Sequence, residues 1–154
     1  MVALTVNAHI AAMMLIMTDR GGNHMTNSSQ ADRILLVARV LIAILCLGGA
    51  LQKLFNPDDA AGLLVGVGLP AGLVYAALLY NGVAGCAILT GYRMRAAVFS
   101  FGVYCAVTSL FHWIPEDPWQ ISIFVKNWAI AGGCLALGVA GSGRIALRPD
   151  PVMG

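Results

Sequence analysis

The sequence predicts an all-α integral membrane protein, a four-helix bundle with both termini cytoplasmic. The first observation is composition, because 59% of the 154 residues are hydrophobic and only 10% are charged. The mean hydropathy of +0.81 leaves too little polar surface for an ordinary soluble domain. The second observation is a series of four apolar segments, each near the roughly 20 residues that a spanning helix needs. Their approximate bounds are 34–55, 70–89, 96–114 and 121–140.

Residues 1–30 are predicted to be an N-terminal extension outside the bundle. The apolar run within this extension is too short to span a membrane, and no basic residue precedes it as in a signal peptide. Met25 opens a polar stretch directly before the first span, which suggests that translation starts there or that the extension is disordered. The expected membrane domain is 31–148, followed by a tail at 149–154.

Each predicted span ends where the sequence stops favouring a helix. The first ends before Pro57, because proline cannot continue a helix, and two acidic residues follow it. The glycine-rich segment 60–69 is too short to span and is interpreted as a re-entrant or interfacial piece. A tight connection at 91–95 leads into the third span, which ends before Pro115. The fourth ends before the polar residues that start at Gly141.

The orientation follows from the charged residues in the short connections. Basic residues near the ends of spans are retained on the cytoplasmic side of a membrane. Here they lie before the first span, between the second and third, and after the fourth, whereas the other connections are acidic. An even number of spans with both termini inside satisfies every connection. The basic residues are Arg33, Arg93, Arg95, Arg144 and Arg148, and the acidic ones are Asp58, Asp59, Glu116 and Asp117.

Small residues within the spans indicate how the helices pack. The four cysteines, one in each span, lack the spacing of a disulfide framework, a redox motif or a zinc site, so we interpret them as packing residues and expect no metal site. Small residues at four-residue spacing predict close helix approach in lipid. These sets are Ala77, Asn81 and Gly85 on the second span, and Gly132, Ala136 and Ala140 on the fourth.

Polar side chains inside the spans indicate a functional site, because polar groups are costly in hydrocarbon. On the first span, polar residues seven apart share one helix face, which we expect to turn inward. On the third span, polar residues four apart form a second polar stripe. Together the two stripes predict a polar bundle interior. The first set is Arg39, Cys46 and Lys53, and the second is Ser100, Tyr104, Thr108 and His112.

Several of these side chains are predicted to converge at the outer end of the bundle. Such a cluster would bind an anion, or would hold the carbonyl oxygens of a quinone while His112, the candidate catalytic residue, exchanges protons near neutral pH. The predicted ligand-binding residues are Gln52, Lys53, Asn81, His112, Lys126 and Asn127.

A simpler interpretation stays open for each of these residues. Lys53 and Lys126 would snorkel to the lipid head groups, the tryptophans would form an interfacial belt, and His112 would cap a helix end. Arg39 is close enough to the inner surface to snorkel as well. Only one histidine lies in a span, so haem is disfavoured. We expect no tightly bound cofactor, and a membrane quinone is the candidate for a loosely bound one. No basic run suits nucleic acid.

Five short motifs between residues 33 and 149 occur in a recognisable order. They are Gly49-Ala50-Leu51-Gln52-Lys53-Leu54 after Arg39, Gly68-Leu69-Pro70, Gly91-Tyr92-Arg93-Met94-Arg95-Ala96-Ala97, Phe111-His112, and Phe124-Val125-Lys126-Asn127 with Gly132-Gly133. In this order the chain resembles the DoxX family of small four-helix bacterial membrane proteins. That family commonly has a glutamate where this chain has Asn81, and a neutral amide cannot act as an acid or counter-charge.

The resemblance implies a multi-pass protein of the bacterial cytoplasmic (inner) membrane. The family is named for a subunit of a thiosulfate:quinone oxidoreductase. We therefore expect a membrane subunit of a quinone-linked oxidoreductase system, with an outer-facing quinone or sulfur-anion site and a partner oxidoreductase subunit. Whether the chain is itself an enzyme is left open. The alternative is a non-catalytic scaffold or anchor for a partner enzyme. Transport of a small solute is a weaker option, since four short helices make a narrow pathway unless the protein oligomerises.

Overall fold

Helices account for every regular element of the part of the chain that the structure describes. The computed structural model describes residues 2–153, with side chains described for residues 28–153. The elements are α1 (Val2–Phe55), α2 (Pro57–Gly66), α3 (Leu73–Thr90), α4 (Met94–Ser109), the short 3-10 helix η1 (Leu110–His112) and α5 (Pro118–Ala140). Most of the predicted extension at 1–30, including the start proposed at Met25, lies outside the residues with described side chains.

Four helices are long and apolar enough to cross a membrane, which confirms the predicted fold class. These candidate spans are Ser28–Phe55, Leu73–Thr90, Met94–His112 and Pro118–Ala140. The fourth begins three residues earlier than predicted, because the side chain of Asp117 accepts hydrogen bonds from the backbone N–H groups of Trp119 and Gln120. Pro118 occupies the first helical turn, where its missing N–H has no cost.

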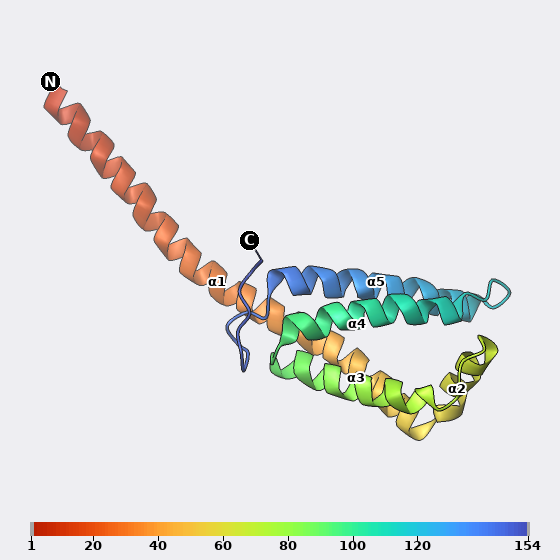
Figure 1. Ribbon diagram of the computed structural model, residues 1–154. Coiled ribbons are helices and arrows are strands. Elements are labelled where there is room, and N and C mark those ends of the chain that lie inside the picture. Colours follow the sequence, from red (N-terminus) through yellow and green to blue (C-terminus); the bar gives the residue numbers. More distant parts are fainter. Residues whose placement is uncertain (1, 154) are drawn as a thin grey trace.

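The segment predicted to be re-entrant or interfacial forms the short helix α2. It begins at Pro57, and Asp58 and Asp59 lie in its first turn, where the helix dipole stabilises negative charge. Helix α2 contacts α1, α3 and η1. It lies at the end of the bundle away from the C-terminus (Figure 1).

The bundle is built from two closely packed helix pairs. The most extensive contacts join α1 to α3 and α4 to α5, and smaller contacts join α3 to α4 and α1 to α5. The chain therefore runs up and down through the bundle with short connections between α3, α4 and α5 (Figure 1). Gly91, with a φ of 74°, ends α3 in the left-handed conformation that a tight turn to α4 requires.

Small residues allow the close approach within each pair, although only one of the two predicted sets does so. A Cβ added to Gly85 would lie 2.7 Å from the Leu47 side chain, so α1 and α3 touch at this glycine as predicted. The set on the fourth span was assigned to the wrong face. Gly132 has no neighbouring atom within 4 Å of an added Cβ, and Ala136 is exposed. The buried face of α5 instead carries Ala131, Cys134, Leu137 and Gly138.

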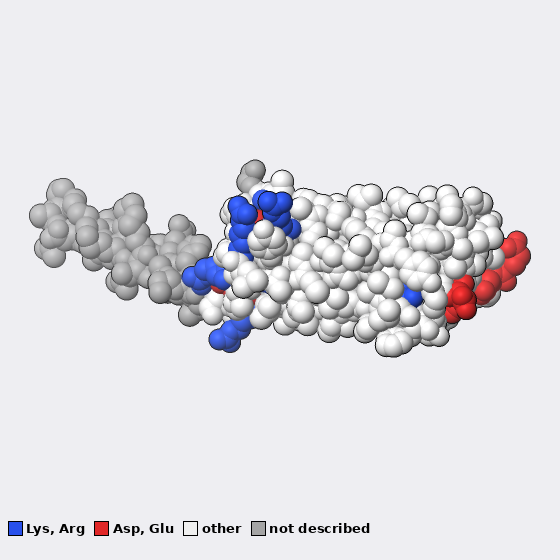
Figure 2. All heavy atoms as spheres, turned by 60° about the horizontal axis from the view of Figure 1, so that its bottom comes forward, with Lys and Arg blue, Asp and Glu red and all other residues white. Residues whose placement is uncertain are grey.

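Charged side chains gather at opposite ends of the bundle. Arginine side chains gather at one end, and most aspartate and glutamate side chains gather at the other (Figure 2). We call the end with Arg33, Arg93, Arg95, Arg144 and Arg148 the basic end, and the end with Asp58, Asp59, Glu116 and Asp117 the acidic end. This separation matches the predicted arrangement of connections. The cytoplasmic location of the basic end remains a prediction from the preference of arginine and lysine for that side.

Arg39 fixes the basic end from inside the bundle. Its side chain is 1% exposed. The guanidinium donates to the carbonyl oxygens of Ile88 (3.1 Å) and Leu89 (2.7 Å) at the end of α3. It also donates to those of Ser142 and Ile145 in the C-terminal tail, residues 141–153. Arg39 therefore points into the bundle instead of snorkelling outward.

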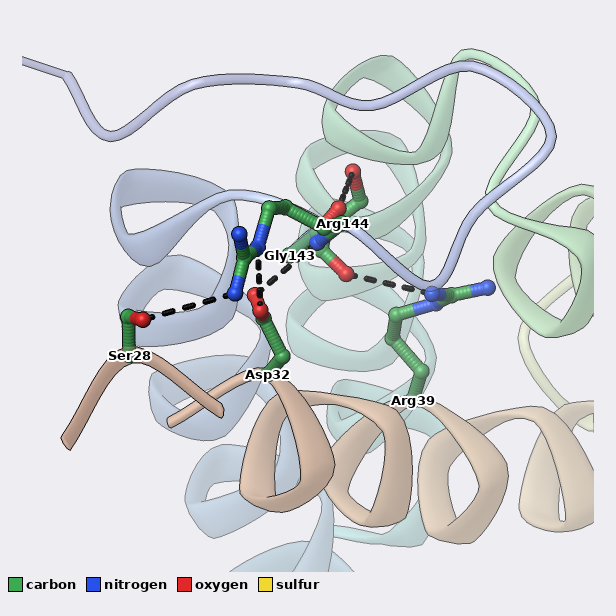
Figure 3. A network of polar contacts seen from close by, with 6 residues as sticks. Ser28, Asp32, Arg39, Gly143 and Arg144 are labelled. Atoms are coloured by element: carbon green, nitrogen blue, oxygen red, sulfur yellow. Dashed lines mark hydrogen bonds and ion pairs between the residues drawn. The ribbon is translucent and has the colours of Figure 1, made fainter. Parts of the chain in front are cut away.

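A second contact holds the same tail to the start of the first span. The guanidinium of Arg144 lies 2.7 Å from the carboxylate of Asp32, and the Arg144 backbone N–H donates to the same carboxylate. Figure 3 shows this pair beside Arg39, with the tail passing between them. Because Arg144 is 72% exposed, this ion pair contributes little energy compared with the buried Arg39 contacts.

Replacement of Arg39 by lysine should destabilise the folded bundle. An ammonium group cannot reach four carbonyl oxygens with the geometry of a planar guanidinium, so at least one buried carbonyl would lose its donor. We expect Arg39→Lys to cost about 2 kcal/mol. The measurement is thermal unfolding in detergent micelles, followed by circular dichroism.

The control for this substitution is Arg33→Lys. The Arg33 side chain is exposed at the same end and makes no hydrogen bond or ion pair with any residue whose side chain is described. Its replacement should change stability by less than about 0.5 kcal/mol. An Arg39→Lys protein that unfolds at the wild-type temperature would contradict a structural role for Arg39.

Candidate functional site

The predicted polar face of the first span turns inward, as expected from its seven-residue spacing. Arg39 and Cys46 are buried, and Lys53 is half-buried. Lys53 lies near the Cys46 and Cys105 thiols and close to the acidic end of the bundle. The helix thus carries a cation at each end of one buried face, but with different surroundings.

Lys53 and Asn81 converge on the backbone of Gly49. The Lys53 ammonium donates to the Gly49 carbonyl oxygen at 3.1 Å. A Cβ at Gly49 would lie 2.8 Å from Asn81 Nδ2 and 3.7 Å from Lys53 Nζ. Because Gly49 has no Cβ, the side chains of Lys53 and Asn81 can both approach its backbone. We call Lys53, Asn81 and Tyr104 the interior cluster.

Tyr104 adds a third helix to this cluster. Its side chain lies close to the side chain of Asn81. The Tyr104 ring lies 5.0 Å from that of Tyr80 and 6.0 Å from that of Phe101, measured between centroids. Helices α1, α3 and α4 each contribute one member of the cluster, and an aromatic wall covers one side of it.

One atom of the interior cluster has no partner. Asn81 is 3% exposed, and its Oδ1 atom accepts no hydrogen bond from the described residues. A buried carbonyl oxygen without a donor is destabilising and is rare in folded proteins. The Cys46 thiol lies 3.2 Å from the Asn81 backbone oxygen, so it satisfies the main chain and not the side chain. The amide oxygen of Asn81 is thus a free acceptor inside the bundle.

The polar stripe predicted on the third span, which begins at Ser100, lies beside the core. The interior of the bundle is largely apolar. Ser100 is exposed and accepts a hydrogen bond from Tyr80 at 2.9 Å, across the seam between α3 and α4. Thr108 is half-buried and donates to the carbonyl oxygen of Tyr104 in its own helix. The prediction of a generally polar interior is therefore wrong. The buried face of α4 carries Met94, Val98, Phe101, Gly102, Cys105 and Ser109.

The cysteines pack mostly in this core, as predicted. Cys46, Cys105 and Cys134 are buried free thiols on α1, α4 and α5, and Cys86 is an exposed free thiol on α3. No group of three potential metal ligands occurs among the described residues.

His112 is engaged at the acidic end. It closes the 3-10 turn η1, and its Nδ1 atom lies 2.6 Å from Oε1 of Gln120 near the start of α5. The contact joins the two ends of the α4–α5 connection. This placement matches the simpler interpretation of His112 as a helix-end residue, and a proton-exchange role remains a prediction.

Gln52, Lys126 and Asn127 are not drawn into the interior cluster by any described contact. Gln52 and Lys126 are exposed, and the Lys126 ammonium lies 5.1 Å from the centre of the Trp119 ring. Asn127 is half-buried, one helical turn before the buried Ala131. The structure therefore joins Lys53 to Asn81, whereas Lys126 adopts the snorkelling position that the simpler interpretation describes.

Several aromatic side chains lie at the acidic end, where Lys126 contacts Trp119. The Trp113 and Phe124 rings have centroids 5.0 Å apart, and those of Phe124 and Trp128 are 6.4 Å apart. The three tryptophans are exposed. This arrangement is typical of the aromatic belts found where membrane helices reach the head-group region.

An apolar groove runs along the outer surface of α1 and α3. Its volume is about 650 Å³. This groove could not be predicted from the sequence, because it depends on the crossing of two helices that are distant in sequence. Residues that line it include Ala50, Leu54, Leu79, Gly82, Val83 and Cys86.

Comparisons with known proteins agree with the motif order found in the sequence. The family described as DoxX matches residues 34–113. The inner membrane protein YqjF of Escherichia coli (strain K12) is 29% identical over 113 residues, which cover 73% of this chain and 87% of that protein. No solved structure matches the chain significantly.

The contact at Gly49 can be tested by adding one methyl group. Gly49→Ala would place a Cβ 2.8 Å from Asn81 Nδ2, so Asn81 would have to move within a packed interior. We expect a loss of about 1–3 kcal/mol in stability, measured by thermal unfolding in micelles.

Gly48→Ala provides a matched control. A Cβ at Gly48 would have no neighbouring atom within 4 Å, so this change should leave stability unaltered or raise it by up to about 1 kcal/mol. Equal effects of the two substitutions would show that α1 and α3 do not meet closely at Gly49.

Proposed function

Because the chain belongs to the DoxX family, we propose that it is a membrane subunit of a quinone-linked oxidoreductase system and that the interior cluster binds the quinone head group. The chain is a multi-pass protein of the bacterial inner membrane. A lipid-soluble carrier is therefore available to it from the surrounding bilayer.

The unpaired Asn81 Oδ1 atom carries the proposal. Asn81 Oδ1 requires a hydrogen-bond donor, whereas the Lys53 ammonium has three N–H groups and uses one for the Gly49 carbonyl oxygen. A quinol hydroxyl would donate to Asn81, and a quinone carbonyl would accept from Lys53. A sulfur anion would suit Lys53 but would supply no donor to Asn81. An oxidised quinone would likewise supply no donor, so the cluster favours the quinol, whose hydroxyl can donate to Asn81 while its other oxygen accepts from Lys53.

The groove between α1 and α3 supports the same ligand. The two helices that supply Lys53 and Asn81 also line this apolar groove, which has the volume of a small-molecule site. An isoprenoid chain would be accommodated against its leucine, valine and glycine residues. The polar head group would bind at the interior cluster, where Lys53 and Asn81 lie on the same two helices but do not line the groove.

Other components would carry the electrons and the protons. Asn81 is neutral, so it would orient the head group and would not take up a proton. His112 remains the candidate for proton exchange, and it would use Nε2, since Nδ1 faces Gln120. In this proposal a partner oxidoreductase subunit supplies the electron donor or acceptor.

A scaffold role is the second candidate, and the outer face of α5 favours it. Gly132 and Gly133 have open space around them, and Ala136 is exposed beside them. Small residues on an exposed face allow another helix to approach closely in lipid. A scaffold would hold a stoichiometric partner, or a second copy, against this face and would bind no quinone.

Binding of a short-chain quinol to the full chain in nanodiscs should depend on the interior cluster. Lys53→Met removes the donor to a quinol oxygen and Asn81→Leu removes the acceptor of a quinol hydroxyl, so each should weaken binding by about tenfold or more, measured by isothermal titration calorimetry. Lys126→Met is the matched control, because it removes a lysine from the exposed Trp119 contact, and it should bind like the wild type.

Three results would change this conclusion. Loss of binding in Lys126→Met alone would move the site to the outer aromatic layer. Non-saturable heat that is equal in all proteins would mean that the quinone only partitions into lipid. In that case, co-purification of a stoichiometric partner would favour the scaffold.

A further inference from the structure

A second hollow opens at the basic end of the bundle, away from the α1–α3 groove. Its volume is about 530 Å³. The start of α4 forms one wall and the C-terminal tail forms the other. The residues that line it are Arg93, Arg95, Ala96, Phe99, Arg148 and Asp150.

The charges around this hollow are not balanced internally. The Arg95 side chain already has partners, because its guanidinium donates to the carbonyl oxygens of Gly138 and Pro151. The Asp150 carboxylate also has a partner, since it accepts a hydrogen bond from the Arg95 backbone N–H at 3.2 Å, near the N-terminus of α4. The side chains of Arg93 and Arg148 are exposed and make no hydrogen bond or ion pair with the described residues. Two guanidinium groups are thus available to a ligand.

The backbone at Arg93 is unusual for an arginine. Its φ is 46°, and it is the one residue other than glycine with a positive φ in the described chain. Glycine would adopt this left-handed conformation without strain, whereas a residue with a Cβ is destabilised there. Strained residues of this kind are concentrated at functional sites. The strain therefore agrees with a role for the Arg93 side chain.

The hollow has an apolar part as well as a charged part. Ala96 and Phe99 lie in the first two turns of α4, inside the candidate span Met94–His112. Arg93 immediately precedes this span, and Arg148 follows the last one. The hollow therefore extends from the water boundary toward the hydrocarbon, which distinguishes it from the single arginines that flank many membrane helices.

We propose that this hollow binds the head group of an anionic phospholipid. Arg93 and Arg148 contact the phosphate, since guanidinium groups bind phosphate oxygens through paired N–H donors. The first part of an acyl chain lies against Ala96 and Phe99. Basic pockets between membrane helices at this depth suit such head groups. Free phosphate shares the charge but would leave the Phe99 wall exposed to water.

Native mass spectrometry of the detergent-purified full chain tests this site. The wild type should retain phosphatidylglycerol in preference to phosphatidylcholine, and excess inorganic phosphate should not displace it. The combined variant Arg93→Gly and Arg148→Gln should bind phosphatidylglycerol about thirtyfold more weakly, since it loses two basic residues at the membrane surface. Arg33→Gln removes an exposed arginine at the same end outside the hollow, and it should behave like the wild type.

The choice of Arg93→Gly separates binding from folding, because glycine relieves the left-handed conformation. Its unfolding temperature should equal or exceed that of the wild type. Equal lipid retention by the combined variant and the wild type would overturn the site. Equal retention of phosphatidylcholine would show that charge is not recognised. Displacement of the lipid by inorganic phosphate would assign the hollow to free phosphate instead.

Discussion

The buried guanidinium of Arg39 is the interaction on which the rest of this structure depends. A helix leaves its last carbonyl oxygens without partners, and in lipid no water is available to satisfy them. Arg39 donates to two such oxygens at the end of α3 and to two more in the tail. One side chain of α1 therefore fixes the position of α3 and of the chain that follows α5. These four acceptors offset much of the cost of burying the charge.

Both proposed ligand sites follow from this arrangement. The tail that Arg39 holds forms one wall of the basic hollow, through Arg148 and Asp150. The α1–α3 pairing that Arg39 fixes at one end brings Gly49 against Asn81 near the other. There the Asn81 amide oxygen, which accepts no hydrogen bond from the described residues, contrasts with the Arg39 guanidinium, which donates four. The fold thus engages one buried polar group and leaves an atom of another available to a ligand.

Much of the fold could be predicted from the sequence because lipid imposes simple requirements. Four apolar segments and alternating charged connections are sufficient to predict a four-helix bundle with a basic end and an acidic end. The inward face of Arg39 and Cys46 follows from helical periodicity. The small residues of α5 that pack against the bundle were predicted wrongly, because small residues occur on both faces of this helix. Only tertiary contacts determine which face is buried.

The candidate site was predictable only in part. The sequence identified Lys53 and Asn81, but it could not show that Gly49 allows them to meet, or that Tyr104 joins them from α4. The sequence also suggested that Lys126 joins them, because both lysines lie at the same depth. In the structure Lys126 is on the exposed face of α5 and contacts Trp119, whereas the next residue, Asn127, is half-buried. Depth can be estimated from hydropathy, but the direction of a side chain depends on how the helices pack.

The most direct measurement of the central claim is photoaffinity labelling of membranes containing the full chain with an azido-quinone, followed by peptide mapping. The account predicts labelling concentrated on α1 and α3 around Gly49 and Asn81, and protection of these peptides by excess unlabelled quinone. Labelling spread over the lipid-facing surfaces of all helices, without protection, would contradict a quinone site in this bundle.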